Sequence, residues 1–188
     1  DVSGNGTPHN LTIEDPANVS WTAEGISVNS ETRATYTPST DMRFLNDCQA
    51  SNQVTIEGWV KPANNTQTGS ARMISYTWDS GNWNFQLAQK ADEYAARLRT
   101  TGNNSNELIG NANSIIPTPD WAHVVYTYDG TDAKIYVDGV EISTTGEDSP
   151  TGDFSNWNSS YVVTLFNEYG ASRQWLGEMA LAAFYSKA

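Results

Sequence analysis

The chain has 188 residues, a formal net charge of −12 and many aromatic residues, with 7 Trp, 9 Tyr and 5 Phe. A chain this acidic repels phosphate backbones, which argues against nucleic acid as a partner, and no apolar run is long enough to insert into a membrane. The one cysteine, Cys48, can form neither an internal disulfide nor a zinc site, so we interpret it as a small buried residue.

Short runs of alternating apolar and polar residues recur along the chain, separated by Gly, Pro, Asn and Asp. This period-two pattern predicts half-buried β-strands. We expect one turn of helix between residues 41 and 52, and irregular polar connections over 103–120 and 146–160. In chain order, the predicted strands span residues 10–13, 21–28, 33–36, 54–62, 71–78, 83–89, 94–100, 121–128, 133–137, 140–143, 161–166 and 175–185.

The most regular stretch runs from Trp121 to Ser143. Asp129-Gly130 and Asp138-Gly139 interrupt it, and Asp-Gly favours tight hairpin turns because Gly adopts positive φ at little cost. We therefore predict a three-stranded antiparallel meander in the middle of a sheet. Many short strands with frequent turns predict an all-β fold in which two antiparallel sheets form a sandwich.

Four segments together resemble one known family. The opening DVSGNG, the strand VTIEGWVKP at 54–62, the stretch WAHVVYTYDGTDAKIYVDGVEI at 121–142 and the closing WLGEMALAAFYSKA are similar to LamG-like members of the concanavalin A-like lectin/glucanase superfamily. The resemblance implies a jelly roll of two curved antiparallel sheets, often with a calcium ion. We expect residues 1–188 to form a single LamG-like domain excised from a longer protein.

In similar domains the N-terminal turn wraps a structural calcium ion, and Asp1 and Asn5 match that motif. Calcium takes about six to eight oxygen ligands, and a glycine-rich turn can supply backbone carbonyls for it. The closing strand departs from the family pattern, because Ala180 and Leu181 stand where acidic residues are common and only Glu178 remains. The alternative is a turn that binds no metal.

Three of the predicted strands carry polar side chains on the face opposite their apolar residues. Two of these side chains are arginines, whose forked donors suit hydroxyl-rich or anionic sugars. The alternative is an ordinary solvated face on which the arginines pair with Glu93 or Asp92. The side chains predicted to share this outer face are Ser75, Thr77, Asn84, Gln86, Arg97 and Arg99.

Two turns combine aromatic rings with amides and charged groups, the mixture with which sugar sites stack on rings and hold hydroxyls. In the alternative, each Trp packs at the rim of the core, which we favour for Trp59 and Trp121, and an Arg173–Glu168 ion pair braces the second turn. The candidate ligand-binding residues are Trp78, Asn82 and Trp83 in the first turn, and Asn167, Glu168, Arg173 and Trp175 in the second.

Catalysis is not expected from this sequence. Glycoside hydrolysis needs two carboxylates across one cleft. Glucanases of the superfamily place them as Glu-x-Asp-x-x-Glu on one strand, whereas the run from Met179 to Ala183 after Glu178 carries no carboxylate. His123 lies in a predicted strand, at the position where the family has a structural histidine.

The sequence therefore predicts a non-catalytic carbohydrate-binding module of an extracellular bacterial enzyme or surface protein, with a polysaccharide or glycan as its partner and a monomeric state within the larger protein. One alternative is an adhesion or spacer domain that contacts protein. Another is a degenerate or unrecognised polysaccharide-cleaving domain. Binding to a panel of polysaccharides separates the first two, and release of cleavage products identifies the third.

Overall fold

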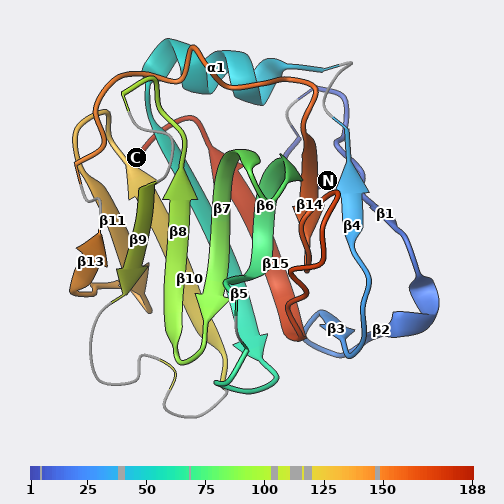
Figure 1. Cartoon of the computed structure of the whole chain (residues 1–188). Helices are drawn as coiled ribbons and strands as arrows, with labels where there is room; N and C mark the ends of the chain where they lie inside the picture. The colour runs from blue at the N-terminus through green and yellow to red at the C-terminus, as the bar shows by residue number, and fades with distance from the viewer. Residues whose placement is uncertain are drawn as a thin grey trace.

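The computed structural model describes residues 1–4, 6–37, 41–67, 69–102, 106–110, 116, 120–146 and 149–188. Within these residues, two antiparallel sheets face each other (Figure 1), which confirms the predicted all-β sandwich. The eight-stranded sheet has the order β1 (Thr12–Ile13), β4 (Ala34–Tyr36), β14 (Val162–Leu165), β6 (Ala71–Asp79), β7 (Asn82–Lys90), β8 (Glu93–Leu98), β9 (Asn106–Gly110), β13 (Thr144–Gly146). The seven-stranded sheet has the order β12 (Val140–Glu141), β11 (Ala133–Val137), β10 (Ala122–Tyr128), β5 (Val54–Pro62), β15 (Gly177–Tyr185), β3 (Ile26–Val28), β2 (Val19–Trp21).

The hydrophobic core lies between the two sheets. In the eight-stranded sheet, Ile74, Leu87 and Ala96 lie side by side in the strand register, and all three are buried. In the seven-stranded sheet, Ile56 and Tyr126 are paired and equally buried. Each large side chain removed from water in this way contributes about 1.5–3 kcal/mol. In β5 and β10, the alternation of apolar residues therefore decides which face of the strand turns inward.

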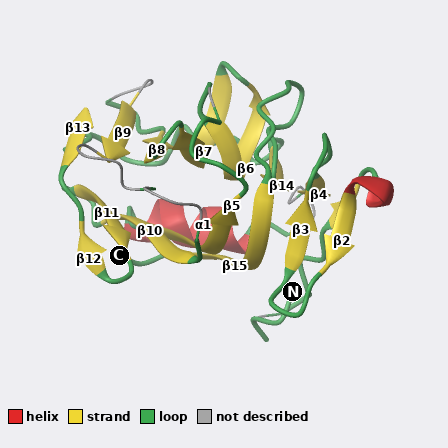
Figure 2. Cartoon of the chain, turned by 90° about the horizontal axis from the view of Figure 1, so that it is seen from below, coloured by secondary structure: helices red, strands yellow, loops and turns green. Residues whose placement is uncertain are grey.

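A helix, α1 (Arg43–Ser51), closes one end of the sandwich, and Figure 2 shows it across the space between the two layers. Leu45 and Cys48, three residues apart on one helical face, are buried. Burial raises the pKa of the Cys48 thiol, which agrees with its interpretation as a small core residue. The sequence analysis expected one helical turn here. The longer helix is stabilised by packing against the core, because its sequence has little helical propensity of its own.

The predicted meander is confirmed as β10, β11 and β12, and Val125 pairs with Tyr136 in its register. Asp138 and Gly139 have φ values of 52° and 79°, as the mirror-image hairpin turn requires. Its position in the sheet was predicted wrongly, because β12, β11 and β10 occupy one side of the sheet from the edge inward, and the central strand is β5. Val140 and Glu141 are both exposed, so this last strand has no buried face that would draw it inward.

Other segments also differ from the prediction. Residues 21–28 form no single strand: β2 and β3 pair as a hairpin, with Gly25 packed against the Met179 carbonyl. The predicted irregular connections contain β9 and part of β13, which pair with each other. A short 3-10 helix, η1 (Pro16–Asn18), follows Asp15, whose side chain accepts a hydrogen bond from the Ala17 amide.

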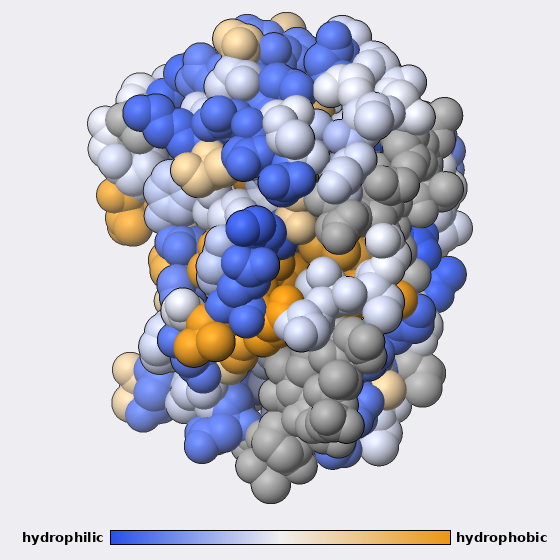
Figure 3. Space-filling view, turned by 90° about the vertical axis from the view of Figure 1, so that its left-hand side faces the viewer, coloured by the Kyte–Doolittle hydropathy of each residue, from blue (hydrophilic) through white to orange (hydrophobic). Residues whose placement is uncertain are grey.

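The side of the sandwich that carries β9, β11 and β13 shows hydrophobic surface between two hydrophilic margins (Figure 3). Val137 and Ile142 are partly buried hydrophobic residues of this region, packed against the core. In the part of the chain that the structure describes, no helix is both long enough and apolar enough to cross a membrane.

Candidate functional site

The predicted polar face of the eight-stranded sheet exists, but it is closed. Ser75, Gln86 and Arg97 are aligned across β6, β7 and β8, as the strand pattern predicted. The side chains of Ser75, Thr77, Asn84 and Gln86 are nevertheless 0% exposed, so the expectation of a solvated outer face is wrong for them. A strand pattern indicates the face on which a side chain lies, but it does not indicate what covers that face.

Two segments cover these polar side chains. Asn84 exchanges two hydrogen bonds with the backbone of Asn158, at 2.9 and 3.0 Å. On β6, the Thr77 hydroxyl accepts a hydrogen bond from the Tyr169 amide at 3.3 Å. The loop after β14, which we call the 166–175 loop, therefore lies over the sheet, and Asn158 covers Asn84 at the end of the sheet near α1.

Glu168 of the 166–175 loop is held in a buried ion pair. Its carboxylate lies 3.0 Å from the Arg72 Nε, and the two side chains are 0% and 2% exposed. Gln86 donates a further hydrogen bond to this carboxylate at 3.3 Å. Burial lowers the pKa of Arg72, and the nearby Glu168 charge opposes that shift. Glu168 therefore braces the loop through Arg72, whereas Arg173, the predicted alternative partner, donates to the Gly69 carbonyl.

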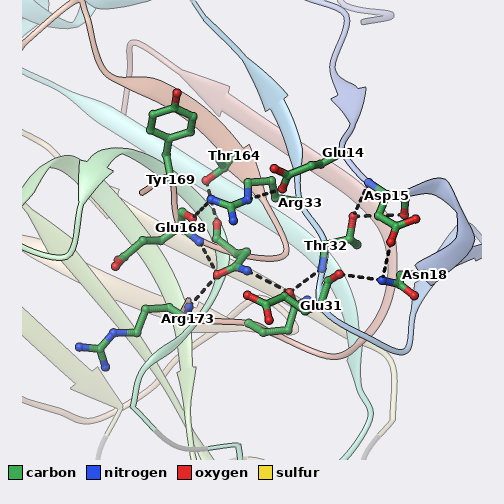
Figure 4. Close-up of polar contacts among 12 residues, drawn as sticks. Glu14, Asp15, Asn18, Glu31, Thr32, Arg33, Thr164, Glu168, Tyr169 and Arg173 are labelled. Atoms are coloured by element: carbon green, nitrogen blue, oxygen red, sulfur yellow. Dashed lines mark hydrogen bonds and ion pairs between the residues drawn. The ribbon is translucent and has the colours of Figure 1, made fainter. Parts of the chain in front are cut away.

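Asn167 fixes the course of the 166–175 loop. Its Oδ1 accepts hydrogen bonds from the amides of Glu168 and Arg173, at 2.9 and 2.7 Å. Its Nδ2 donates to Gln174, whose Oε1 also accepts from the Thr32 amide. Figure 4 shows how this network joins the loop to the segment that precedes β4. Asn167 is fully buried, so its role here is structural and it cannot reach a ligand.

Trp175 belongs to the core, which corrects its assignment as a candidate sugar contact. It is 0% exposed, and its indole nitrogen donates to the Gln89 Oε1 at 2.9 Å. Gly177 lies so close that an added Cβ would stand 2.6 Å from the ring. The sequence places Trp175 beside polar turn residues, and this context does not distinguish a buried ring from an exposed one.

Trp78 and Asn82 lie at the tip of the β6–β7 hairpin and are exposed. Trp78 is 48% exposed, and its ring centroid is 5.3 Å from that of Tyr169 in the 166–175 loop. The turn is preformed, since Asp79 accepts hydrogen bonds from the Gly81 amide and the Asn82 side chain. These bonds hold the pKa of Asp79 below its ordinary value.

Trp83 lies behind this tip, on the outer face of the sheet, between two arginines. Arg97 and Arg99 stand 5.3 and 5.1 Å from the centroid of its ring, within the range of cation–π attraction. Arg99 also donates to the Gly81 carbonyl at 3.2 Å, in place of the predicted pairing with Glu93 or Asp92. Trp83 itself is buried: the two arginines cover its ring, and Arg99 also holds the hairpin turn through Gly81.

We call the exposed or half-buried residues at this place the aromatic rim: Trp78, Asn82, Arg99 and Tyr169. Directly beneath it, among the described residues, the Gln86 Oε1 and the Glu168 Oε1 are buried without a hydrogen-bond partner. Buried acceptors of this kind usually bind an ordered water. The rim can offer a ring face, an amide and a guanidinium to a ligand, which is the chemistry that a sugar needs.

Tyr169 was missing from the candidate residues that the sequence supplied. The signal was present, because Tyr169 follows Glu168 in the loop that the sequence analysis selected. Trp59 is a second omission: it is 41% exposed, against the prediction that it packs on the core. Its alternation with the buried Gly58 and Val60 indicated an outward side chain. Trp121 is half-buried.

Calcium binding at the N-terminal turn stays a prediction. The two oxygens of the Asp1 carboxylate accept hydrogen bonds from the Ser3 and His9 amides, both at 2.8 Å. The pocket at this turn is lined by one carboxylate residue and five residues without charged side chains, Asp1 with Val2, Ser3, Gly4, Gly6 and Pro8. Asn5 lies outside the described residues, and Glu178 pairs with Lys61 at 3.2 Å. Among the described residues, no three or more acidic, His or Cys side chains form a metal-binding group.

A family model described as concanavalin A-like lectin/glucanases superfamily matches residues 25–188. No curated protein matches the chain. Solved structures share the fold at low identity. The binding domain of botulinum neurotoxin DC, determined in complex with rat synaptotagmin II, is 13% identical with a TM-score of 0.67, over 95% of this chain and 44% of that one.

Two further structures have the same fold. Domain 4 of AbnA, an extracellular arabinanase from Geobacillus stearothermophilus in complex with arabinotriose, is 17% identical with a TM-score of 0.57, over 98% of this chain and 85% of that domain. A sialidase from Trypanosoma rangeli is 15% identical with a TM-score of 0.61, over 90% of this chain and 26% of the enzyme. The chain thus spans less than half of the toxin domain and about a quarter of the sialidase, and identities this low establish the fold alone.

Proposed function

Because the chain belongs to the concanavalin A-like lectin/glucanase superfamily, we propose that it binds a carbohydrate at the aromatic rim without cleaving it. The proposal extends to its setting, an extracellular or cell-surface protein of which this domain forms one part. Two solved neighbours support a glycan as the ligand. One was determined in complex with arabinotriose, and the other is botulinum neurotoxin type C, whose cell entry depends on interaction with two ganglioside molecules.

The observation that carries this proposal is the exposed Trp78 ring packed against Tyr169. The two rings come from the β6–β7 hairpin and the 166–175 loop, and both segments are braced by hydrogen bonds. A ring fixed in this way stacks on the apolar face of a sugar at a small cost in side-chain entropy. At the same turn, the Asn82 amide oxygen is an acceptor for sugar hydroxyls, and the Arg99 guanidinium is a donor.

The carboxylates near the rim support the proposal that the domain does not cleave its ligand. Glycoside hydrolysis needs an acid and a second carboxylate on either side of the bond. Glu168 is buried against Arg72, and Asp79 is occupied by the hairpin turn. Among the described residues of the rim, no pair of accessible carboxylates faces a common space.

Electrophoresis of the purified domain through native gels that contain neutral or acidic polysaccharides tests the rim. Wild-type protein should be retarded by at least one polysaccharide, and Trp78→Ala should weaken that retardation by roughly tenfold, about 1.4 kcal/mol. Trp21→Ala is the matched control, because Trp21 is an exposed Trp on the edge strand β2. Equal retardation of Trp78→Ala and wild-type protein would place the ligand elsewhere, and sugar release from any polysaccharide would make the domain an enzyme.

A further inference from the structure

The outer face of the seven-stranded sheet carries large exposed side chains in adjacent register positions. Trp59 on β5 lies between His123 on β10 and Leu181 on β15. Tyr185 lies further along the same face, opposite Thr55. Trp59, Leu181 and Tyr185 are 41%, 40% and 48% exposed. Most exposed hydrophobic residues are scattered singly over a protein surface, so three on one sheet face call for an explanation.

A carboxylate fixed on both oxygens lies within this group. The Glu57 Oε1 accepts a hydrogen bond from the Tyr185 hydroxyl at 2.8 Å, and the Glu57 Oε2 lies 3.2 Å from the His123 Nε2. The bond to Glu57 raises the pKa of Tyr185, so this hydroxyl keeps its proton and remains a donor. A carboxylate oxygen can accept about two hydrogen bonds, so each oxygen of Glu57 keeps acceptor capacity for a ligand.

We propose that this face is a second carbohydrate site, which binds a neutral polysaccharide chain across β5 and β15. Trp59 and Tyr185 stack against sugar rings, and Glu57 accepts hydrogen bonds from sugar hydroxyls between them. Four residues of strand separate the register positions of the two rings, roughly 13 Å at the usual rise per residue, so the ligand is an extended chain. The site goes beyond the proposed function, because this face and the aromatic rim lie on opposite sides of the sandwich.

The carboxylate decides between a sugar and a protein as the occupant. An apolar protein surface placed on Trp59 and Leu181 would remove Glu57 from water without supplying donors, which is energetically costly. Sugar hydroxyls supply such donors while the ring faces cover the aromatic side chains. Acidic glycans are disfavoured, since the carboxylate and the net charge of −12 repel them.

Affinity electrophoresis on gels with hydroxyethyl cellulose, arabinan, galactomannan or polygalacturonate tests the second site. Trp59→Ala should reduce retardation by a neutral polysaccharide roughly tenfold, and Glu57→Gln should reduce it less, since the amide retains one acceptor. Trp21→Ala again serves as the control, and melting curves establish that each variant folds. If Trp59→Ala does not fold, Leu181→Glu replaces it, because this exposed residue next to Trp59 can take a charge without disturbing the core.

The outcomes separate the two sites. If Trp78→Ala loses retardation while Trp59→Ala, Glu57→Gln and Leu181→Glu are retarded as strongly as wild-type protein, the second site is overturned and the aromatic rim is retained. If Trp78→Ala keeps its retardation and the second-site variants lose theirs, the rim is overturned and the second site is supported. Retardation of wild-type protein by no neutral polysaccharide overturns the second site. So does a wild-type dimer that Leu181→Glu converts to a monomer, since the face is then an interface between copies of the chain.

Discussion

The two outer faces of the sandwich differ in which side chains are exposed to solvent. On the eight-stranded sheet, polar residues such as Gln86 and Ser75 are buried beneath the 166–175 loop and bonded within the protein. On the seven-stranded sheet, the aromatic residues Trp59 and Tyr185 remain exposed. Residue polarity therefore predicts the wrong accessibility on both faces. The comparison teaches that the loops that cross a sheet decide which side chains a ligand can reach.

The largest effect is expected from breaking the buried ion pair on the closed face. Arg72→Met leaves the Glu168 charge buried without its partner, and should lower the free energy of unfolding by about 3–5 kcal/mol. Urea denaturation measures the loss. Arg173→Met is the matched control from the same region, with an expected loss below about 1 kcal/mol. Similar losses in both variants would mean that the closed face is not organised by the Arg72–Glu168 pair.

A smaller loss of unfolding free energy should follow when the 166–175 loop is loosened. Asn167→Ala removes the acceptor of two loop amides and should cost about 2 kcal/mol of unfolding free energy. Asn82→Ala, an exposed side chain that also holds a turn, should cost about 0.5 kcal/mol. Thermal unfolding compares the two variants. An equal cost would remove the distinction between a loop that covers a face and a turn at its edge.

The stability contributed by the β6–β7 turn at the aromatic rim should depend on pH. Because the pKa of Asp79 is lower in the folded protein than its ordinary value of 3.8, its ionisation stabilises the fold above pH 3.8. That contribution is lost as the pH falls through the folded-state pKa. The stability difference between wild-type protein and Asp79→Asn should therefore shrink on acidification below pH 4, as melting curves in a pH series can measure. A difference that stays constant with pH would contradict this assignment.

The smallest effect concerns calcium, which bears on neither sheet face. Backbone amides already donate to both oxygens of the Asp1 carboxylate, so we expect the melting temperature to be the same in calcium and in chelator. Magnesium is the control for a general salt effect. A rise in melting temperature with calcium alone would restore the ion that the family resemblance implies.

The long strands could be predicted from the sequence because they bury one continuous face. β5 has the predicted bounds of Val54 and Pro62, and its buried and outward residues alternate as expected. The short strands β9 and β13, at one side of the eight-stranded sheet, were missed, since they pair with each other across a long separation in sequence and have little periodicity of their own.

The candidate site was only partly predictable for a related reason. Strand alternation predicts that Gln86 and Arg97 lie on the same face, and the turn residues between β6 and β7 predict the exposed hairpin tip. The burial of Glu168 and Trp175 depends on contacts with Arg72 and Gln89, about 90 residues away in the chain. No local pattern records such contacts, so these two residues were mistaken for ligand contacts.

The single thiol under α1 provides a chemical reporter of how the sandwich opens. Cys48 is fully buried, and a raised pKa keeps it protonated, so a thiol reagent reacts with it only after the helix detaches. Its labelling rate at increasing urea concentration would separate detachment of this end from unfolding of both sheets. Because the sequence contains no other cysteine, the measurement needs no mutation.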